Sequence, residues 1–219
     1  MAQAFSSNPT NPSSISNPFF ARIWPVLATH EPKALRALRR ENLAGLSGRV
    51  LEVGAGIGTN FPYYPDAVDH VVALEPEEQL AAQARAAADV VGVSVAVAAT
   101  TVEAFGGDEP FDAVVCSAVL CSVPDPGGVL RHLHSLLRPG GELRYLEHVA
   151  SAGARGRLQR LADATVWPAL FGNCHTHRDA ERSIIGAGFE VDTSRREMML
   201  PAWAPSPVSE IAIGRARRR

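Results

Sequence analysis

Residues 50 to 60 read Val50-Leu51-Glu52-Val53-Gly54-Ala55-Gly56-Ile57-Gly58-Thr59-Asn60. A short apolar segment here runs into three glycines at alternate positions, a pattern typical of a buried strand followed by a turn. Because glycine carries no side chain, a ligand can lie against the backbone N–H groups at the start of a following helix. The stretch therefore predicts the first strand of an α/β fold, with a bound ligand at its carboxyl end.

A second apolar run, Val71-Val72-Ala73-Leu74, is followed by Glu75 and Pro76. Glu75 stands 21 positions after Gly54, where the next parallel strand is expected to end. A carboxylate at this place can accept hydrogen bonds from both hydroxyls of a ribose. The glycines and Glu75 together predict a nucleoside ligand.

The glycine spacing narrows the choice of nucleoside. In a dinucleotide-binding turn, G-x-G-x-x-G, the third glycine would be residue 59, which is Thr59 in this chain. Glu52, two residues before the first glycine, would repel a pyrophosphate at close range and would attract an ammonium group. The stretch thus favours a nucleoside that carries an ammonium group over a dinucleotide.

The composition limits the classes of function. The 219 residues suffice for one α/β domain with a proper core. A net charge of −2, with 20% charged residues, gives no basic field for nucleic acid or anionic lipid. No apolar run approaches the ~20 residues that span a bilayer, and the N-terminus does not resemble a signal peptide. We expect a soluble, cytoplasmic protein, a monomer or homodimer, without nucleic-acid or membrane partners.

The cysteines and histidines give no recognisable metal-binding spacing. Cys116, Cys121 and Cys174 match neither a zinc site nor a C-x-x-C redox pair. His175 and His177 form an H-x-H pair without a third ligand at a familiar distance along the chain. We therefore expect no bound metal.

The domain plan is simple. Residues 1–17, rich in Ser, Asn and Pro, are expected to form a flexible arm, because they bury too little apolar surface to fold. Residues 18–219 are expected to form one domain. Within it, residues 18–46 predict short helices broken by Pro25 and Pro32, which act either as a lid over the ligand cleft or as plain packing elements.

Strands and helices alternate along most of the domain. Helical residues are expected after the glycine turn, to about Tyr64. Further helices are expected at 77–88, 126–137 and 176–187, and further strands at 71–74, 93–98, 111–117 and 142–148. Two last strands, one from Gly188 and one at 208–214, are joined by a proline-rich connection without helical period, which indicates an antiparallel return. The prediction is an α/β fold with a mostly parallel sheet that ends in an antiparallel hairpin. The arginines at 215, 217, 218 and 219 are expected to form a solvated basic tail.

Several motifs of this chain also occur together in a known family. They are Leu51-Glu52-Val53-Gly54, Asn60-Phe61, Tyr64-Pro65, Val119-Leu120-Cys121-Ser122-Val123, Leu137-Arg138-Pro139-Gly140-Gly141, Glu147-His148-Val149, Gly172-Asn173-Cys174 and Ala187-Gly188-Phe189. From about Phe19 onward the chain resembles the class I S-adenosylmethionine (SAM) methyltransferases. The similar branch contains the vertebrate microsomal alkyl-thiol methyltransferases and their bacterial relatives, and the quinone C-methyltransferases are more distant. The resemblance implies a Rossmann-like, seven-stranded sheet and SAM as the cofactor.

The resemblance also implies a set of cofactor-binding residues: Glu52, Gly54, Gly56, Gly58, Asn60, Glu75, Pro76, Thr101, Val102, Cys116 and Ser117. By this resemblance Glu52 faces the aminocarboxypropyl end of SAM, Glu75 holds the ribose, and Thr101 with Val102 borders the adenine. Cys116 and Ser117 would line the methionine end, although Cys116 can equally be a core thiol.

The chain also departs from the family in ways that matter. Many relatives have Asp at the positions of Glu75 and Thr101; a hydroxyl at residue 101 still accepts a hydrogen bond, but a weaker one. The N-terminal membrane anchor of the vertebrate enzymes is not expected here.

Three residues are candidates for catalysis. Methyl transfer is an in-line displacement, so the main task is to hold the nucleophile close to the methyl group in a dry pocket. A thiol, with an ordinary pKa of ~8.5, needs only modest activation. His148 is the first candidate for a base or substrate contact, with tying the strand end to a loop as the alternative; His175 and Glu147 follow. Cys121 is expected to pack near the substrate pocket, since nothing beside it in sequence supplies a base or cation.

The chain is therefore expected to be an enzyme that transfers a methyl group from SAM to a small, partly apolar molecule, with a thiol favoured by the resemblance. Three alternatives remain: an O-, N- or C-methyltransferase of specialised metabolites or quinone-like substrates, a SAM-binding protein without catalysis, and a nicotinamide-dependent reductase. Thr59 and the terminal hairpin argue against the reductase.

Overall fold

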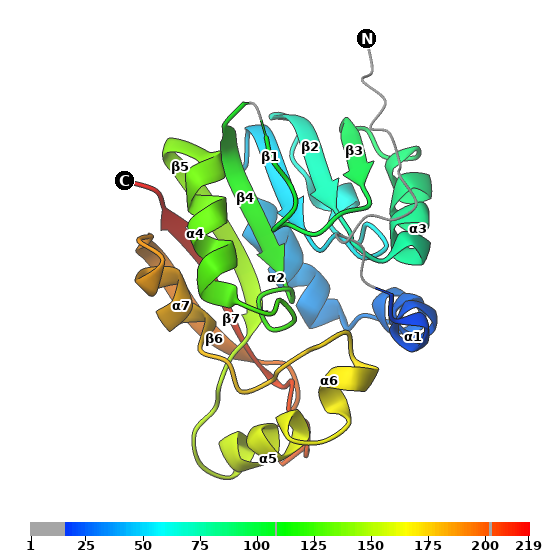
Figure 1. The fold of residues 1–219 in the computed structure, drawn as a ribbon, viewed down its shortest axis with the longest axis vertical. Coiled ribbons are helices and arrows are strands. Elements are labelled where there is room, and N and C mark those ends of the chain that lie inside the picture. The colour runs from blue at the N-terminus through cyan, green and yellow to red at the C-terminus, as the bar shows by residue number, and fades with distance from the viewer. Residues whose placement is uncertain (1–15, 108, 202) are drawn as a thin grey trace.

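The computed structural model describes residues 16–107, 109–201 and 203–219. Its centre is a seven-stranded sheet with the order β3-β2-β1-β4-β5-β7-β6 (Figure 1). The strands are β1 (Gly48–Val53), β2 (Val68–Leu74), β3 (Val95–Ala98), β4 (Phe111–Ser117), β5 (Leu137–His148), β6 (Glu190–Met198) and β7 (Glu210–Arg217). β1 to β5 are parallel, and β7 runs antiparallel to both of its neighbours. The predicted fold class, a mostly parallel sheet with a terminal antiparallel hairpin, is confirmed.

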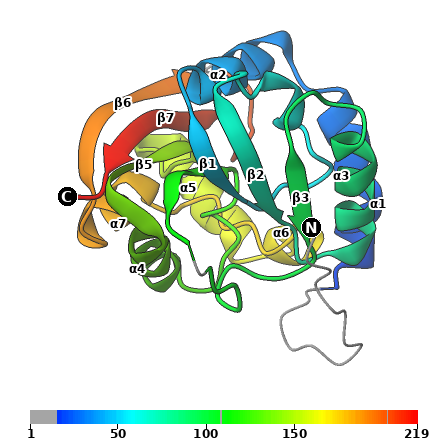
Figure 2. The ribbon, with the colours of Figure 1, turned by 90° about the horizontal axis from the view of Figure 1, so that it is seen from above.

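Helices cover both faces of the sheet. They are α1 (Pro18–Thr29), α2 (Lys33–Leu43), α3 (Glu78–Ala88), α4 (Pro126–Leu136), α5 (Gly153–Asp163), α6 (Trp167–Leu170) and α7 (Ala180–Gly186), with a 3-10 helix, η1 (Phe61–Tyr63). α4 and α7 lie on one face and α2 on the other (Figures 1 and 2). In the described part of the chain, no helix is long and apolar enough to cross a bilayer.

The alternation of side chains along β1 explains these two layers. Leu51 and Val53 point into the core beside α4 and α7, whereas Val50 points into the core on the opposite face, beside η1 and α3. Successive side chains of a strand face opposite sides, so a continuous apolar strand must be buried on both. The near-continuous apolar character of β1 therefore places it in the middle of the sheet.

The parallel strands all end at one edge, the lower edge in Figure 1. Beyond this edge lie α5 and α6, and α1 lies beside it under α3. Ligands of open parallel sheets bind outside the carboxyl ends of the strands, where loops from several strands meet.

The two helices that were expected to form a lid differ in their positions. Trp24 of α1 reaches the glycine turn, and Phe20 of the same helix reaches Gly172. α2 instead packs on the sheet through Leu35 and Leu38, against apolar side chains of β5 and β7. Only α1 is thus placed where a lid would be, and its movement stays a prediction.

Two helix predictions were wrong in their extent. After the glycine turn the chain forms turns and η1 rather than an α-helix, because Pro62 and Pro65 each lack a backbone N–H and restrict the preceding residue. α7 begins at Ala180, four residues later than expected, and its N-cap is Asp179. Thr176 cannot cap this helix, since its N–H and hydroxyl both donate to Asp163.

The two ends of the chain also differ in detail from the expectation. Residues 1–15 of the predicted flexible arm lie outside the described residues, whereas Asn17 accepts a hydrogen bond from the N–H of Phe20 and caps α1. Two of the terminal arginines, 215 and 217, belong to β7, and both pair with Asp192 of β6. The expected solvated tail is thus part of the terminal hairpin as far as residue 217.

Candidate active site

The glycine turn after β1 leaves no space for side chains at Gly54 and Gly56. The N–H of Gly56 donates to Oε2 of Glu75 over 2.8 Å. Gly56 has φ +58°, and a Cβ added there would lie 2.6 Å from Nε1 of Trp24. A Cβ added at Gly54 (φ +67°) would likewise lie 2.6 Å from Cγ2 of Val119. Both positions thus require glycine, for backbone conformation and for space.

Glu75, at the end of β2, is a buried carboxylate without a cation beside it among the described residues. Its oxygens accept hydrogen bonds from the N–H groups of Gly56 and Glu77. Burial raises the pKa of Glu75 to about 7, although these two hydrogen bonds act in the opposite direction. The carboxylate is therefore poised for additional donors, such as a pair of hydroxyls.

A second buried carboxylate, Glu52, ends a chain of polar groups. Its Oε1 accepts from Nδ2 of Asn60, and its Oε2 accepts from the hydroxyl of Tyr64, each over 2.8 Å. Asn60 also accepts a hydrogen bond from Arg39 of α2 and lies 3.3 Å from Oγ of Ser117. Burial raises the pKa of Glu52 to about 7, against the effect of these hydrogen bonds. An ammonium group beside Glu52 would favour its ionised form.

Arg39 is a functional candidate that the sequence did not reveal. It is buried, and its other guanidinium nitrogen pairs with Glu31 at 2.5 Å. In sequence, Arg39 is one of several charged residues of an amphipathic helix, and such residues usually face solvent. Its contact with Asn60 follows only from the way α2 packs on the sheet.

The other expected cofactor residues also lie at this edge. Thr101 and Val102 follow β3, whose end is tied to Glu75 by the bond from the Glu75 N–H to the Ala98 carbonyl. Pro76 is half-buried beside Glu75. Cys116 is a fully buried core thiol whose pKa is raised by burial, whereas Ser117 is only partly buried and faces Asn60. The assigned roles stay predictions, but the fold brings these residues to one place.

The three catalytic candidates have different environments. Glu147 is fully buried, and its Oε1 accepts from the N–H groups of Val119 and Leu120 in the loop after β4. Within the described part of the chain, no hydrogen-bond partner is recorded for its Oε2. Burial raises the pKa of Glu147 to about 7, against the effect of hydrogen bonds from the loop amides of Leu120, Val119 and Cys121. His148, the last residue of β5, is partly exposed. His175 is also partly exposed, and its backbone N–H donates to the carbonyl of Cys121.

His148 meets two cysteines. Its Nδ1 lies 3.9 Å from Sγ of Cys174, and the ligand atoms of Cys121, His148 and Cys174 all lie within 4.8 Å of one another. A hydrogen bond from Cys121 is the main reason that the pKa of the Cys174 thiol is below its usual value. Burial opposes protonation of His148, but its hydrogen bond with Cys121 and the charges of Cys121 and Glu147 together raise its pKa.

This cluster could not be found by spacing along the chain. The prediction that the Cys121 thiol has no base beside it was based only on its neighbours in sequence. In space, the imidazole of His148 and the thiol of Cys174 lie beside Cys121. These residues come from three of the motifs that carry the family resemblance, Leu120-Cys121-Ser122-Val123, Glu147-His148-Val149 and Gly172-Asn173-Cys174. The three motifs thus form one cluster near the carboxyl ends of β4 and β5.

Comparisons with known proteins identify the family. The family model described as a methyltransferase domain matches residues 27–193. The chain is 32% identical to the thiol S-methyltransferase TMT1B of Mus musculus, over 91% of this chain and 84% of that protein. The chain belongs to the SAM-dependent methyltransferases. It is also 32% identical to the human thiol S-methyltransferase TMT1A, over 68% of this chain and 64% of that protein.

Solved structures agree with this assignment of the fold. The N-methyltransferase NodS of Bradyrhizobium japonicum WM9, solved with S-adenosylhomocysteine (SAH), superposes with a TM-score of 0.67. The match covers 93% of this chain and 99% of NodS, at 17% identity. At this identity the likeness concerns the fold alone.

The residues of this methyltransferase suit SAM. The cofactor carries an ammonium group, a ribose and an adenine, and the edge offers two buried carboxylates and a turn that a Cβ would obstruct. Burial raises the pKa values of Glu52 and Glu75, so a cation or further donors beside these carboxylates would favour their ionised forms. When bound, SAM supplies an electrophilic methyl group on a sulfonium, and these residues would hold and orient it.

Proposed function

We propose that this methyltransferase transfers the methyl group of SAM to the sulfur of a small, partly apolar thiol. The observation that carries the proposal is the similarity to thiol S-methyltransferases along most of the chain. The acceptor sulfur forms a bond to the methyl carbon while the bond from that carbon to the sulfonium breaks, and its electron pair stays on SAH. The thiol proton is released.

The acceptor side of the site supports a thiol over an alcohol. An aliphatic hydroxyl needs a committed strong base, whereas a thiol is close to its pKa at neutral pH. Glu147 is fully buried and uses one oxygen to accept from two loop amides. We therefore propose Glu147 as a positioning residue, with His148 and His175 on the acceptor side. The eleven residues assigned to the cofactor by resemblance are proposed in those roles.

An apolar hollow beside the cluster supports a partly apolar acceptor. It has a volume of about 330 Å³ and is lined mainly by side chains of α5 and α6: Leu158, Leu161, Ala162, Thr165, Val166, Trp167 and Leu170. Trp167 also interacts with Cys174. An apolar group held against α6 would thus lie next to the cluster.

The proposal is tested with matched acceptors. Purified protein is incubated with SAM and with a linear alkanethiol, the alcohol and amine of the same chain length, and a thiophenol and phenol pair. Mass spectrometry is expected to detect methyl thioethers and no methyl ethers or methylamines. Methylation of the oxygen or nitrogen acceptors alone would refute the thiol assignment and leave the family assignment intact. SAH binding without turnover on any acceptor would favour a non-catalytic SAM-binding protein.

A further inference from the structure

Three potential metal ligands converge at the acceptor side of the site. Cys121 comes from the loop after β4, His148 from the end of β5 and Cys174 from the segment before α7. Both cysteines are free thiols and are buried, with 2% and 6% of their surface exposed. Cysteine sulfur and imidazole nitrogen are the ligands that zinc and similar soft cations prefer.

The spacing of the three atoms suits a small tetrahedral ion. With metal–sulfur bonds of about 2.3 Å and metal–nitrogen bonds of about 2.0 Å, tetrahedral ligand atoms lie roughly 3.5 to 3.8 Å apart. In the structure, Nδ1 of His148 and Sγ of Cys174 are 3.9 Å apart, and all three ligand atoms lie within 4.8 Å of one another. Side-chain rotations that move the ligand atoms by about 1 Å would bring all three to tetrahedral spacing.

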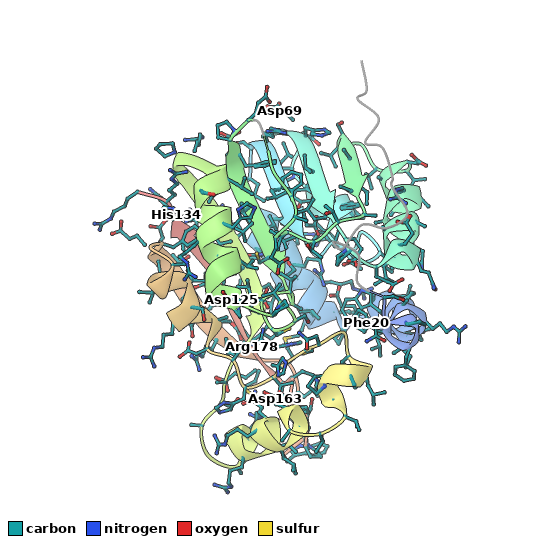
Figure 3. The ribbon with its side chains drawn as sticks, in the orientation of Figure 1. Phe20, Asp69, Asp125, His134, Asp163 and Arg178 are labelled. Carbon is teal, nitrogen blue, oxygen red and sulfur yellow. The ribbon has the colours of Figure 1, made fainter. Side chains whose placement is uncertain are left out.

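The backbone around the cluster is held by bonds that do not involve a metal. The carbonyl of Cys121 accepts from the His175 N–H over 2.8 Å. The neighbouring carbonyl of Ser122 accepts from Nδ2 of Asn173 over 2.6 Å. Arg178 donates to the carbonyl of Leu120 over 3.0 Å and lies between the sheet edge and α5 (Figure 3). Both cysteine segments are therefore fixed to each other before any ion binds, as in a preorganised site.

Backbone strain is concentrated at the same place. Among the described residues, the non-glycine residues with positive φ are Ala118 (φ 56°) and Asn173 (φ 64°). Ala118 lies three residues before Cys121, and Asn173 directly precedes Cys174. Such conformations are unfavourable for residues with a side chain and occur often at functional sites.

A buried donor also lies beside the cluster. The indole N–H of Trp167 is buried, and, besides the hydrogen bond from Cys121, its hydrogen bond to Cys174 lowers the pKa of that thiol. N–H groups around metal-bound thiolates orient the ligand and stabilise its negative charge. Trp167 is thus placed as a supporting donor for a thiolate ligand.

We propose that Cys121, His148 and Cys174 bind a soft divalent cation of the zinc class. Three protein ligands leave one tetrahedral position, as in catalytic zinc sites. On the basis of the proposed function, this fourth position takes the acceptor thiol, which loses its proton to water and binds as a thiolate. His148 then acts as a metal ligand rather than as a free base, and selection for sulfur acceptors follows from the metal.

The test measures metal binding first, without SAM or acceptor. The full chain, purified under reducing conditions and stripped of metal, is titrated with Co²⁺ and then with Zn²⁺. Co²⁺ is expected to produce a sulfur-to-cobalt charge-transfer band and tetrahedral ligand-field bands, at about one ion per chain, and Zn²⁺ is expected to remove them.

The variants Cys121→Ser, Cys174→Ser and His148→Ala are expected to weaken the binding of Co²⁺ by more than about 100-fold, because loss of a mere supporting residue already costs about 10- to 100-fold. Cys116→Ala is the matched control: it removes the cysteine outside the cluster and is expected to keep the cobalt spectrum. Circular dichroism of each variant shows whether it is folded. Cys121→Asp keeps a possible ligand and is expected to bind with a weaker charge-transfer band, because it supplies one sulfur fewer.

Adding acceptors separates this inference from the proposed function. An alkanethiol is expected to change the cobalt spectrum, and the matched alcohol is not. A cobalt site with no methylation of thiols would refute the proposed function and support metal binding. Full methylation of thiols by metal-free protein, with no cobalt spectrum, would refute the metal site alone. A disulfide between Cys121 and Cys174 formed in air, without any cobalt spectrum in reductant, would also refute it.

Discussion

At the scale of single residues, Glu75 links the cofactor site to pH. Burial raises its pKa to about 7, and only the ionised form accepts hydrogen bonds from both ribose hydroxyls. We expect 5′-methylthioadenosine, which has the ribose but no ammonium group, to bind more weakly as the pH falls below about 7. Glu75→Gln should weaken binding by about tenfold or more and flatten this dependence, since a bond to a charged group contributes about 1.5–3 kcal/mol.

Calorimetric titration of methylthioadenosine at several pH values measures this effect. The exposed Glu103→Gln is the control and should behave like the parent. A pH dependence that survives in Glu75→Gln would show that another group governs ribose binding.

Substitution of Glu52 is expected to change the stability of the protein and its dependence on pH. Folding raises its pKa from 4.5 to about 7 through burial. Its contribution to stability is therefore fully present below pH 4.5 and is lost as the pH rises through 7. As the pH rises from about 5 to about 8, the free energy of unfolding of the cofactor-free parent should fall relative to that of Glu52→Gln. The expected change is on the order of up to 3 kcal/mol.

Urea unfolding of the parent and of Glu52→Gln, at about pH 5 and at about pH 8, measures how the difference between their free energies of unfolding changes with pH. Addition of SAH should reduce it, because the ammonium group favours the ionised parent carboxylate. An equal free-energy difference at both pH values would show that Glu52 is already ionised in the folded, cofactor-free protein.

At the scale of elements, α1 is expected to close over the cofactor. Trp24 reaches Gly56, and Phe20 reaches Gly172, so the helix lies beside the edge of the sheet, where Phe20 is labelled in Figure 3. Hydrogen exchange of residues 18–29 should slow when SAH binds, because ordered helices exchange less. Trp24→Ala should remove most of this protection and raise the Kd for SAH several-fold, whereas Val26→Ala on the exposed side should not. Unchanged exchange of α1 on SAH binding would contradict the lid.

The loop after β4 provides a test of the role of Glu147. A base is lost on substitution by either Gln or Ala, but a positioning residue is partly replaced by Gln, whose oxygen still accepts the loop amides. We expect Glu147→Gln to keep most of kcat, and Glu147→Ala to lose about 2–4 kcal/mol of stability through two unsatisfied N–H groups. Loss of kcat in Glu147→Gln, with KM and stability unchanged, would instead identify a base.

The helices, strands and turns differ in how well the sequence predicts them. Strands such as β4 are evident from apolar runs, because buried parallel strands need apolar side chains on both faces. The glycine turn is evident because its backbone conformation excludes other residues. The predicted start of α7 was wrong because Thr176 donates hydrogen bonds to Asp163, which is distant in sequence. Thr176 therefore cannot act as the N-cap of α7. Local rules fail where a distant residue competes for a hydrogen bond.

At the scale of the whole molecule, the fold brings together groups that the sequence keeps apart. The residues assigned to the cofactor by resemblance lie at or near the carboxyl ends of the parallel strands, and their roles stay predictions. The buried contact from Arg39 to Asn60 and the meeting of Cys121 with Cys174 were not predictable from the sequence, because they depend on how α2 and the segment before α7 pack. The metal-free expectation rested on spacing along the chain, and spacing does not determine distance across a sheet edge.

The whole account depends on the atom that receives the methyl group. The most direct measurement supplies SAM with a deuterated methyl group together with one acceptor that carries both a thiol and a hydroxyl on a short apolar chain. Mass spectrometry and NMR of the product then locate the label. The account predicts the deuterated methyl group on sulfur, and a label on oxygen, or none in protein that binds SAH, would contradict it.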